Sequence, residues 1–159
     1  MQILKATILH LDDLVPMFDD YRQSYRMSSN IKAGNQFLTE RLQKQDSEIY
    51  IAVADTNEIA GFIQLYPLFS SLRMRKVWIL NDLYVKVAFR GEGVARKLVA
   101  RAKELSVYSR SAGLLVETQK TNEVANSMYP RLGFQMYRSF NSYFWENKLA
   151  SKEIEQLNI

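Results

Sequence analysis

The order of strand-like and helix-like segments predicts an α+β domain built around a mixed sheet. Strand-like runs at 48–54 and 59–66 flank the polar segment 55–58, which is typical of an antiparallel hairpin. Strand-like and helix-like segments then alternate between 74 and 129, as they do in parallel β-α-β units. No internal repeat or low-complexity linker interrupts the 159 residues, so we expect a single domain over residues 1–159.

The elements before the hairpin are recognised by their periodicity. Residues 2–9 alternate loosely, as in a first strand, and apolar residues at spacings of three and four begin at Leu11. Pro16 fits within the first turn of the helix that this spacing predicts. A polar break at 28–30 separates this helix from a second, shorter helix at about 33–45.

Six further elements are expected after the hairpin. A long strand leads through a glycine-containing loop into a strongly periodic helix, and a short apolar strand and another helix follow. Alternating aromatic residues near the end of the chain predict two closing strands. These elements lie at about 74–87, 94–105, 114–118, 122–129, 134–138 and 140–147.

The composition excludes several kinds of catalytic chemistry. The chain has no cysteine and a single histidine, His10. Thiol catalysis, cysteine-ligated metals, a histidine pair for zinc and a Ser-His-Asp triad are therefore excluded, and we expect no metal site.

The charge balance mildly favours an anionic partner. The chain has 21 basic and 17 acidic residues, a formal charge of +4, which suits a phosphorylated small molecule. The basic residues are spread along the chain and no nucleic-acid motif is present, so we expect no nucleic-acid partner. There is no run of about 18 apolar residues and no signal-peptide pattern, so we expect no membrane association and a cytoplasmic location.

A strand, a loop with two glycines and a helix follow one another directly at 85–95, which favours phosphate binding. The amino end of a helix presents unpaired amides and a positive dipole end, and glycine lets the backbone approach an anion closely. The segment 90–95 (RGEGVA) lacks the Gly-Lys-Ser/Thr of a Walker A loop, and it lacks the third glycine of the dinucleotide fingerprint.

A second block lies one helix and one strand further along the chain. Residues 122–129 read NEVANSMY, and Leu-Gly-Phe follows at 132–134. Together with RGEGVA at 90–95, this block resembles the GCN5-related N-acetyltransferase (GNAT) superfamily. Its signatures are an Arg/Gln-x-x-Gly-x-Gly/Ala loop and an Asn-x-x-Ala-x-x-x-Tyr helix before Leu-Gly-Phe. The order of elements agrees from residue 2 to about 147, almost the whole chain.

The resemblance implies a three-layer α/β/α fold with about seven strands, in which strand four (77–87) splays from strand five (114–118). It further implies that acetyl-coenzyme A, as co-substrate, lies in that gap, and that a β-bulge near 83–84 frees backbone groups for the pantetheine arm. The cofactor-binding residues implied are Leu83, Val85, Val87, Arg90, Gly91, Glu92, Gly93, Val94, Ala95, Arg96, Asn122, Asn126 and Tyr129.

Three residues are candidates for the proton transfers of acetyl transfer. Tyr129 is the residue that the resemblance implies as the acid that protonates the leaving thiolate, although Pro130 is expected to end its helix early. Asp82 or Glu117 would take the proton of the amine, and a route without a protein base stays open. Asn122 is equally suited to cap its helix.

The sequence therefore predicts an acyl-coenzyme A-dependent N-acyltransferase that acts on a primary amine in a ternary complex. A small amine or polyamine is favoured over a protein amine, because Asp19, Tyr21, Tyr25 and Glu48 could hold a cation. The alternative is a non-catalytic acyl-coenzyme A binding or sensing module of the same fold. A homodimer is plausible, and the acyl group is either acetyl or longer.

Overall fold

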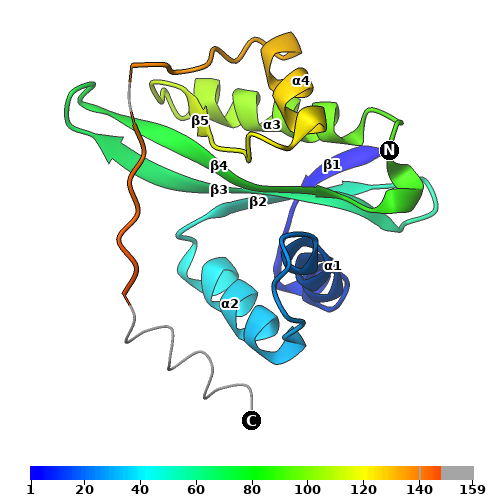
Figure 1. The fold of residues 1–159 in the computed structure, drawn as a ribbon. Helices are drawn as coiled ribbons and strands as arrows, with labels where there is room; N and C mark the ends of the chain where they lie inside the picture. The colour runs from blue at the N-terminus through cyan, green and yellow to red at the C-terminus, as the bar shows by residue number, and fades with distance from the viewer. Residues whose placement is uncertain (140, 148–159) are drawn as a thin grey trace. The chain divides into compact units, whose positions relative to one another are not determined.

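A five-stranded mixed sheet forms the centre of the first compact unit of the chain, Met1–Glu117 (Figure 1). The computed structural model describes residues 1–139 and 141–147. Neighbouring strands are antiparallel up to β4, and β4 and β5 are parallel, which confirms the predicted mixed sheet. In sheet order the strands are β1 (Gln2–Lys5), β2 (Glu48–Val53), β3 (Ile59–Ser70), β4 (Arg75–Val85) and β5 (Leu114–Val116).

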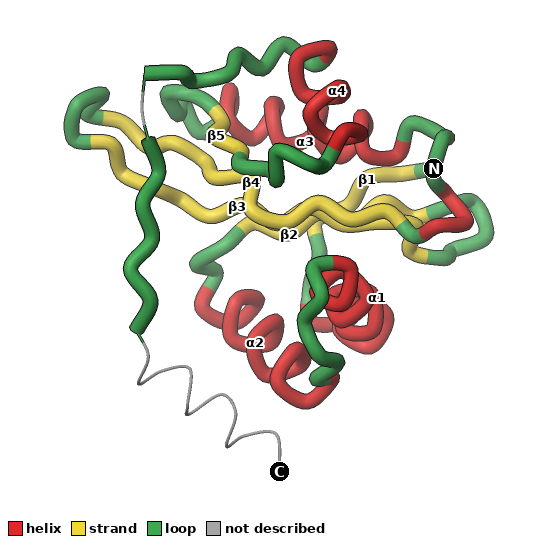
Figure 2. The backbone as a smooth tube through the Cα atoms, viewed as in Figure 1, coloured by secondary structure: helices red, strands yellow, loops and turns green. Residues whose placement is uncertain are grey.

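Three helices cover the two faces of this sheet. Helices α1 (Leu11–Ser24) and α2 (Ile31–Lys44) lie on one face, and α3 (Val94–Tyr108) lies on the other (Figure 2). The side chain of Asn30 begins α2 by accepting a hydrogen bond from the amide of Ala33 at 2.9 Å. The core between the sheet and the first two helices contains Ala6, Leu14, Val15, Met17, Phe18, Leu38, Ile49, Ile51, Ile59 and Phe62.

Asp19 is a buried carboxylate of α1 that fixes the connection to α2. Its oxygens accept hydrogen bonds from the hydroxyl of Ser29 at 2.6 Å, the amide of Asn30 at 2.8 Å and the side chain of Gln23 at 2.9 Å. Burial raises the pKa of this carboxyl, but these hydrogen bonds and the nearby Arg22 outweigh it and hold the pKa below its usual value. Both oxygens already have partners within the fold, which argues against Asp19 as a ligand for a cationic acceptor.

Gly61 allows β3 to approach β4 closely. A Cβ atom at this position would lie 2.5 Å from the carbonyl oxygen of Tyr84 and 3.3 Å from the Cα of Val85. Because these are backbone atoms of a paired strand, we expect Gly61→Ala to lower the free energy of unfolding by about 1–3 kcal/mol. Chemical denaturation of the variant and the wild type checks this prediction.

Gly34→Ala is the matched control. Gly34 lies in α2, and a Cβ atom there would meet the Phe18 ring at 3.5 Å, an ordinary contact. Since alanine favours a helix over glycine, this substitution should leave the free energy of unfolding unchanged or raise it by about 0.5–1 kcal/mol. Equal effects of the two substitutions would contradict the role assigned to Gly61.

The second compact unit, Thr118–Ile159, contains the helix α4 (Glu123–Arg131). The side chain of Asn122 accepts a hydrogen bond from the amide of Ala125 at 3.1 Å, so Asn122 caps this helix. The side-chain nitrogen Nδ2 of Asn126 donates to the carbonyl of Gln119 at 2.9 Å and to that of Asn122 at 2.8 Å. These bonds fix the loop that leads into α4.

Pro130 lies inside α4 and does not end the helix early, contrary to the prediction. It occupies the last turn, where a missing amide removes only one hydrogen bond, and the amide of Leu132 still donates to the carbonyl of Met128 at 3.1 Å. Tyr129 is buried, and its ring packs edge-on against that of Phe134 with centroids 5.3 Å apart.

The two predicted closing strands are absent from the described residues 134–139 and 141–147, so the prediction of seven strands is wrong for this part of the chain. Tyr143, Phe144 and Trp145 are exposed there, and Phe140 lies outside the described residues. An alternating aromatic pattern indicates strand propensity, but a strand also needs a ladder partner, which the pattern does not specify.

Candidate active site

Strand β4 carries a β-bulge at Asn81. Gln64 of β3 pairs with Asp82. The next residue of β3, Leu65, pairs with Leu80, and Asn81 is therefore the extra residue of the bulged strand. Asn81 is exposed and Asp82 is only 5% exposed, so the extra residue faces solvent while the paired residue next to it faces the interior.

The parallel pairing of β4 with β5 is short. Its last register pair joins Leu80 to Val116, and β4 runs on to Val85 with no described strand on that side. Asp82 lies just beyond the last pair on β4, and Glu117 directly follows β5. The two residues considered as bases thus lie where the two strands part, the first buried and the second exposed.

The bulge changes the direction of the backbone amides at the end of β4. The amide of Trp78 donates to the carbonyl of Gly113, just before β5, at 3.1 Å, whereas the amide of Lys86 donates to the carbonyl of Ala60 in β3 at 2.9 Å. An unbroken strand would direct residues 78 and 86 to the same side. After the bulge, alternation therefore directs the amides of Leu83 and Val85 away from β3, to the open side of β4.

A buried row of polar side chains holds Asp82 in place. The side-chain Nε2 of Gln64 donates to Oδ2 of Asp82 at 2.8 Å, and the side-chain Nδ2 of Asn81 donates to Oδ1 at 3.1 Å. The amide oxygen of Gln64 accepts a hydrogen bond from the hydroxyl of Ser47 at 3.0 Å. Gln64 is fully buried, and Ser47 is nearly so.

The environment of Asp82 favours its protonated form more than water does. Burial raises the pKa of this carboxyl above its usual value, and the hydrogen bonds of Gln64, Tyr21 and Asn81 only partly oppose the rise. A raised pKa brings a carboxylate closer to the range in which it can take a proton from an ammonium and release it again.

Aromatic rings lie beside Asp82 on the face of the sheet that α1 covers. The ring of Tyr21 packs edge-on against those of Tyr25, Phe62 and Tyr84, with centroids 5.2, 5.8 and 6.2 Å apart. The hydroxyl of Tyr21 lies 3.5 Å from the carbonyl oxygen of Asn81, within hydrogen-bonding distance. Rings beside a carboxylate form an environment that favours a cation.

The loop before α3 has the features of an anion site. Gly91 and Gly93 have φ angles of 84° and 76°, which glycine adopts without strain. The amide of Lys97 donates to the carbonyl of Gly93 at 3.1 Å and begins the helical bonds of α3, so the amides of residues 94–96 precede the hydrogen-bonded turns. No acidic residue lies in the first turn to offset the positive end of the helix dipole.

Arg90 connects this loop to the end of β4. Its Nε donates to the carbonyl oxygen of Val85 at 3.0 Å, and its guanidinium lies 5.8 Å from the centre of the Tyr84 ring. The bond uses Nε only, so the two terminal amino groups can donate to an anion. Val87 lies in the 3-10 turn Val87–Phe89 and not on the strand, so the prediction that strand four extends to residue 87 is wrong.

The structure brings the predicted residues of the first unit together in two neighbouring places. Leu83, Val85 and Asp82 lie on β4 after the bulge, and the loop 90–96 follows within the same strand-turn-helix connection. Asn122, Asn126 and Tyr129 lie on α4 or at its start, in the second unit. Their contacts with the cofactor stay predictions.

Three participants of the Asp82 row were missed from the sequence. Ser47, Gln64 and Asn81 carry no motif, and only strand pairing brings the first two beside Asp82. The bulge was expected at 83–84 and lies before that segment. The signal that could have located it is the pair of adjacent polar residues, Asn81 and Asp82, which interrupts an otherwise apolar strand at the position of the extra residue.

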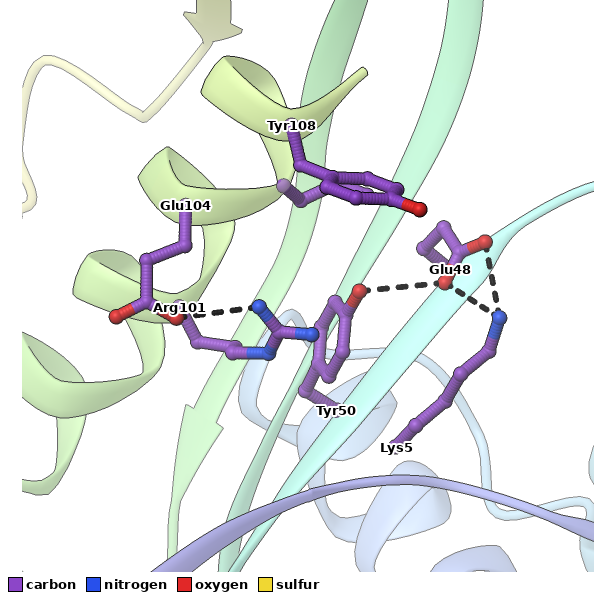
Figure 3. A pocket seen from close by; sticks show the side chains of 7 residues that line it. Lys5, Glu48, Tyr50, Arg101, Glu104 and Tyr108 are labelled. Atoms are coloured by element: carbon purple, nitrogen blue, oxygen red, sulfur yellow. Dashed lines mark hydrogen bonds and ion pairs between the residues drawn. The ribbon is translucent and has the colours of Figure 1, made fainter.

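A groove of about 460 Å³ lies on the opposite face of the sheet, beside α3 (Figure 3). Lys5 pairs with Glu48 at 2.8 Å, and Arg101 pairs with Glu104 at 3.1 Å while its guanidinium lies 4.6 Å from the centre of the Tyr50 ring (Figure 3). Burial and Glu48 raise the pKa of Tyr50 to about 12. Glu48 is thus paired on the face away from Asp82, which argues against its binding an acceptor at that carboxylate.

The described residues contain neither a cluster of metal ligands nor a membrane-spanning helix. Within 1–139 and 141–147, no group of three or more His, Cys, Asp or Glu side chains is arranged to hold a metal ion. In the same part of the chain, no helix has the length and apolar character needed to cross a membrane.

Comparison with known proteins identifies the family. The model of the acetyltransferase (GNAT) family matches residues 14–134. An uncharacterized N-acetyltransferase, YhfO, of Bacillus subtilis (strain 168) is 34% identical over 143 residues, covering 90% of this chain and 95% of that protein. A probable acetyltransferase of Haemophilus influenzae is 29% identical over 136 residues, covering 86% and 91%.

A solved structure agrees with these matches. The crystal structure of a probable acetyltransferase has a TM-score of 0.89 and 40% sequence identity, and the match covers 93% of this chain and 99% of that one. The bulged strand, the glycine-containing loop and the mixed sheet thus belong to an acetyltransferase fold. The chain is a member of the GNAT family.

Proposed function

We propose that this protein transfers an acetyl group from acetyl-coenzyme A to a primary amine, by direct attack in a ternary complex. The observation that carries the proposal is the bulge at Asn81, which places a buried carboxylate and outward-directed amides on the same short stretch of β4. Membership of an acetyltransferase family supports the reaction class. A cytoplasmic location and a single domain remain part of the proposal.

The end of β4 and the start of α3 suit acetyl-coenzyme A as the donor. The amides of residues 94–96, the glycine backbone and the terminal amino groups of Arg90 are donors for the pyrophosphate. The amides of Leu83 and Val85 suit the amide carbonyls of the pantetheine arm. This would direct the thioester along the open side of β4, toward Asp82.

Asp82 is the base in this proposal. Its carboxylate takes one proton from the acceptor ammonium, and the neutral amine then attacks the thioester carbonyl carbon. When the tetrahedral intermediate collapses, the carbon–sulfur bond breaks and the hydroxyl of Tyr129 donates a proton to the thiolate. The nitrogen loses its second proton as the amide forms, and that proton restores the Tyr129 hydroxyl. Asp82 releases its proton to water, so the net products are the acetylated amine, coenzyme A and one proton.

The surroundings of Asp82 favour a small cationic amine as acceptor. Tyr21 faces the carboxylate and packs against the rings of Tyr25 and Tyr84, and a cation is attracted to the faces of such rings. A polyamine or another small diamine fits this chemistry, because one ammonium is deprotonated while another stays charged.

Thiol release from acetyl-coenzyme A with a panel of amines tests the proposal. The panel contains polyamines, amino acids, aminoglycosides and peptides with free amino termini or lysines, and mass spectrometry identifies the acetylated product. We expect turnover with a small cationic amine. Tight binding of coenzyme A without turnover on any amine would instead favour a non-catalytic acyl-coenzyme A sensing module.

Tyr129→Phe should lower kcat by about 10- to 10,000-fold, because it removes the proposed proton donor to the thiolate. The change keeps the ring that packs against Phe134, so a loss of activity in the folded variant is assigned to the hydroxyl. Thiol release measured with the best amine checks the prediction, and Tyr137→Phe, an exposed tyrosine of the same unit, is the control. Unchanged kcat in Tyr129→Phe would remove this residue from the mechanism.

A further inference from the structure

The Gln64 side chain has only one orientation that suits an ionised Asp82. Its amide has a donor end and an acceptor end, and both are used: Nε2 donates to Asp82 at 2.8 Å, and Oε1 accepts from Ser47 at 3.0 Å. If the amide were reversed, Oε1 would face the carboxylate. That arrangement repels an ionised carboxylate but offers an acceptor to a protonated one.

Ser47 favours the observed orientation of this amide. Its hydroxyl donates to the Oε1 end of Gln64, whereas a reversed amide would present Nε2, and the hydroxyl would have to turn and accept. The hydroxyl proton would then lose this partner, and because Ser47, Gln64 and Asp82 are buried, water does not readily replace it. The orientation of one neutral amide is therefore coupled to the protonation of a carboxylate on another strand. Ser47 precedes β2, Gln64 lies on β3 and Asp82 lies on β4, so three neighbouring segments of the sheet build the row.

We propose that Ser47 and Gln64 are positioning residues that hold Asp82 as a hydrogen-bond acceptor, ready to receive a proton from the amine. The proposal rests on the proposed function, in which Asp82 is the base. Neither Ser47 nor Gln64 needs to touch the substrate for this role. They act by stabilising one protonation state of a third residue.

The other groups that face Asp82 do not titrate in the range concerned. Tyr21 faces it from α1 and Tyr66 from β3, and burial together with the charge of Asp82 raises the pKa of both phenols above the usual value near 10. Both phenols therefore stay protonated below pH 9. A titration observed at Asp82 between pH 4 and 9 would belong to the carboxyl itself.

Ser47→Ala is the variant that tests the coupling. Without the hydroxyl, the Gln64 amide can reverse and accept a hydrogen bond from protonated Asp82. We expect the titration midpoint of Asp82 to rise by roughly half to one pH unit, the shift that one lost hydrogen bond typically produces. Selective carbon-13 labelling of aspartate allows NMR to follow this midpoint in the resting protein, without any turnover.

The pH profile of kcat/KM gives the second readout. Its acidic limb should move upward by the same amount in Ser47→Ala, while the plateau at high pH stays within about twofold of the wild type, since Asp82 is ionised there. Ser71→Ala, at an exposed serine of the β3–β4 turn, should change neither readout. Ser47→Thr restores the hydroxyl and should return the midpoint to that of the wild type.

The outcomes separate this proposal from the proposed function. An identical NMR midpoint in the wild type and in folded Ser47→Ala would overturn the positioning role, whatever the activity. A raised midpoint without an acidic limb in the rate profile would support the coupling but remove Asp82 as the base. If Ser47→Ala does not fold, Gln64→Glu provides the second variant. Two neighbouring carboxyls would then share one proton, which should raise the titration midpoint of Asp82 above that of the wild type. An unchanged midpoint would contradict the coupling.

Discussion

Asp82→Asn should lower kcat/KM for the acceptor amine by about 100- to 10,000-fold at pH 7, because it removes a positioned proton acceptor. The substitution keeps the shape of the side chain, so the Gln64 amide can still donate to the remaining oxygen, while the exposed Asn81 side chain, which loses its acceptor, can turn to water. The acidic limb of the rate profile should also disappear, since an amide does not titrate. Steady-state kinetics from pH 5 to 9 check both expectations.

Stability should not fall with this loss of activity. Burial raises the pKa of Asp82 in the folded protein. The protonated side chain therefore contributes stability that is fully present below the unfolded pKa, near 3.9. This stability is lost as the pH rises through the higher folded pKa. At pH 7 an asparagine avoids that cost, and Asp82→Asn should be at least as stable as the wild type. Chemical denaturation at pH 4 and pH 7 measures the difference.

The exposed Asp20 of α1 provides the control for Asp82. Asp20→Asn changes the net charge equally and should leave kcat/KM unchanged. If folded Asp82→Asn kept the activity of the wild type, Asp82 would not be the base, and Glu117 or a route without a protein base would remain.

Gly93→Asp should weaken the binding of coenzyme A by about 10- to 100-fold. Gly93 precedes α3 with a left-handed φ of 76°, a conformation that asparagine and aspartate adopt more readily than other side chains. A carboxylate at this position lies beside the amides proposed to hold the pyrophosphate, and the repulsion between like charges opposes binding. Isothermal titration calorimetry with coenzyme A gives the dissociation constant.

Gly93→Asn separates this charge effect from the backbone effect. Asparagine has nearly the same shape and φ preference as aspartate but no charge, so the ratio of the two dissociation constants measures electrostatics alone. Aspartate at a helix cap also stabilises a helix, so Gly93→Asp should unfold at no lower denaturant concentration than Gly93→Asn. Equal dissociation constants for the two variants would contradict an anion site at this loop.

Pantetheine is the matched ligand, because it lacks the pyrophosphate of coenzyme A. Its dissociation constant should be the same in Gly93→Asp and Gly93→Asn. A large difference would indicate that the carboxylate disturbs the end of β4 and does not act through the phosphates.

Local periodicity was sufficient to predict most of the fold. The spacing of apolar residues in α1 and α3 and the polar turn at 55–58 each depend on neighbours in the chain, and these elements formed as expected. The sequences at 134–138 and 140–147 have strand-like alternation too, yet the described residues there form no strand. Whether such a segment pairs is decided by a distant edge, which local pattern does not contain.

The candidate site shows the same division. The loop 90–95 was located from its glycines, because a backbone requirement leaves a direct trace in the sequence. Ser47 and Gln64 left no such trace, since a neutral side chain acquires its role only from the strand register that places it beside Asp82. The position of the bulge was missed for a related reason. The extra residue of β4 is defined by the register with β3, and one extra residue shifts the direction of every amide after it.

If the bulge at Asn81 turns part of β4 toward the cofactor, coenzyme A should protect particular backbone amides of that strand. Amide hydrogen exchange of the wild-type protein, measured by NMR with and without coenzyme A, tests it within a single strand. Coenzyme A should slow exchange at the amides of Leu83 and Val85, while those of Asp82 and Tyr84, which alternation directs to β3, should change little. Binding of coenzyme A without added protection at Leu83 and Val85 would contradict the account.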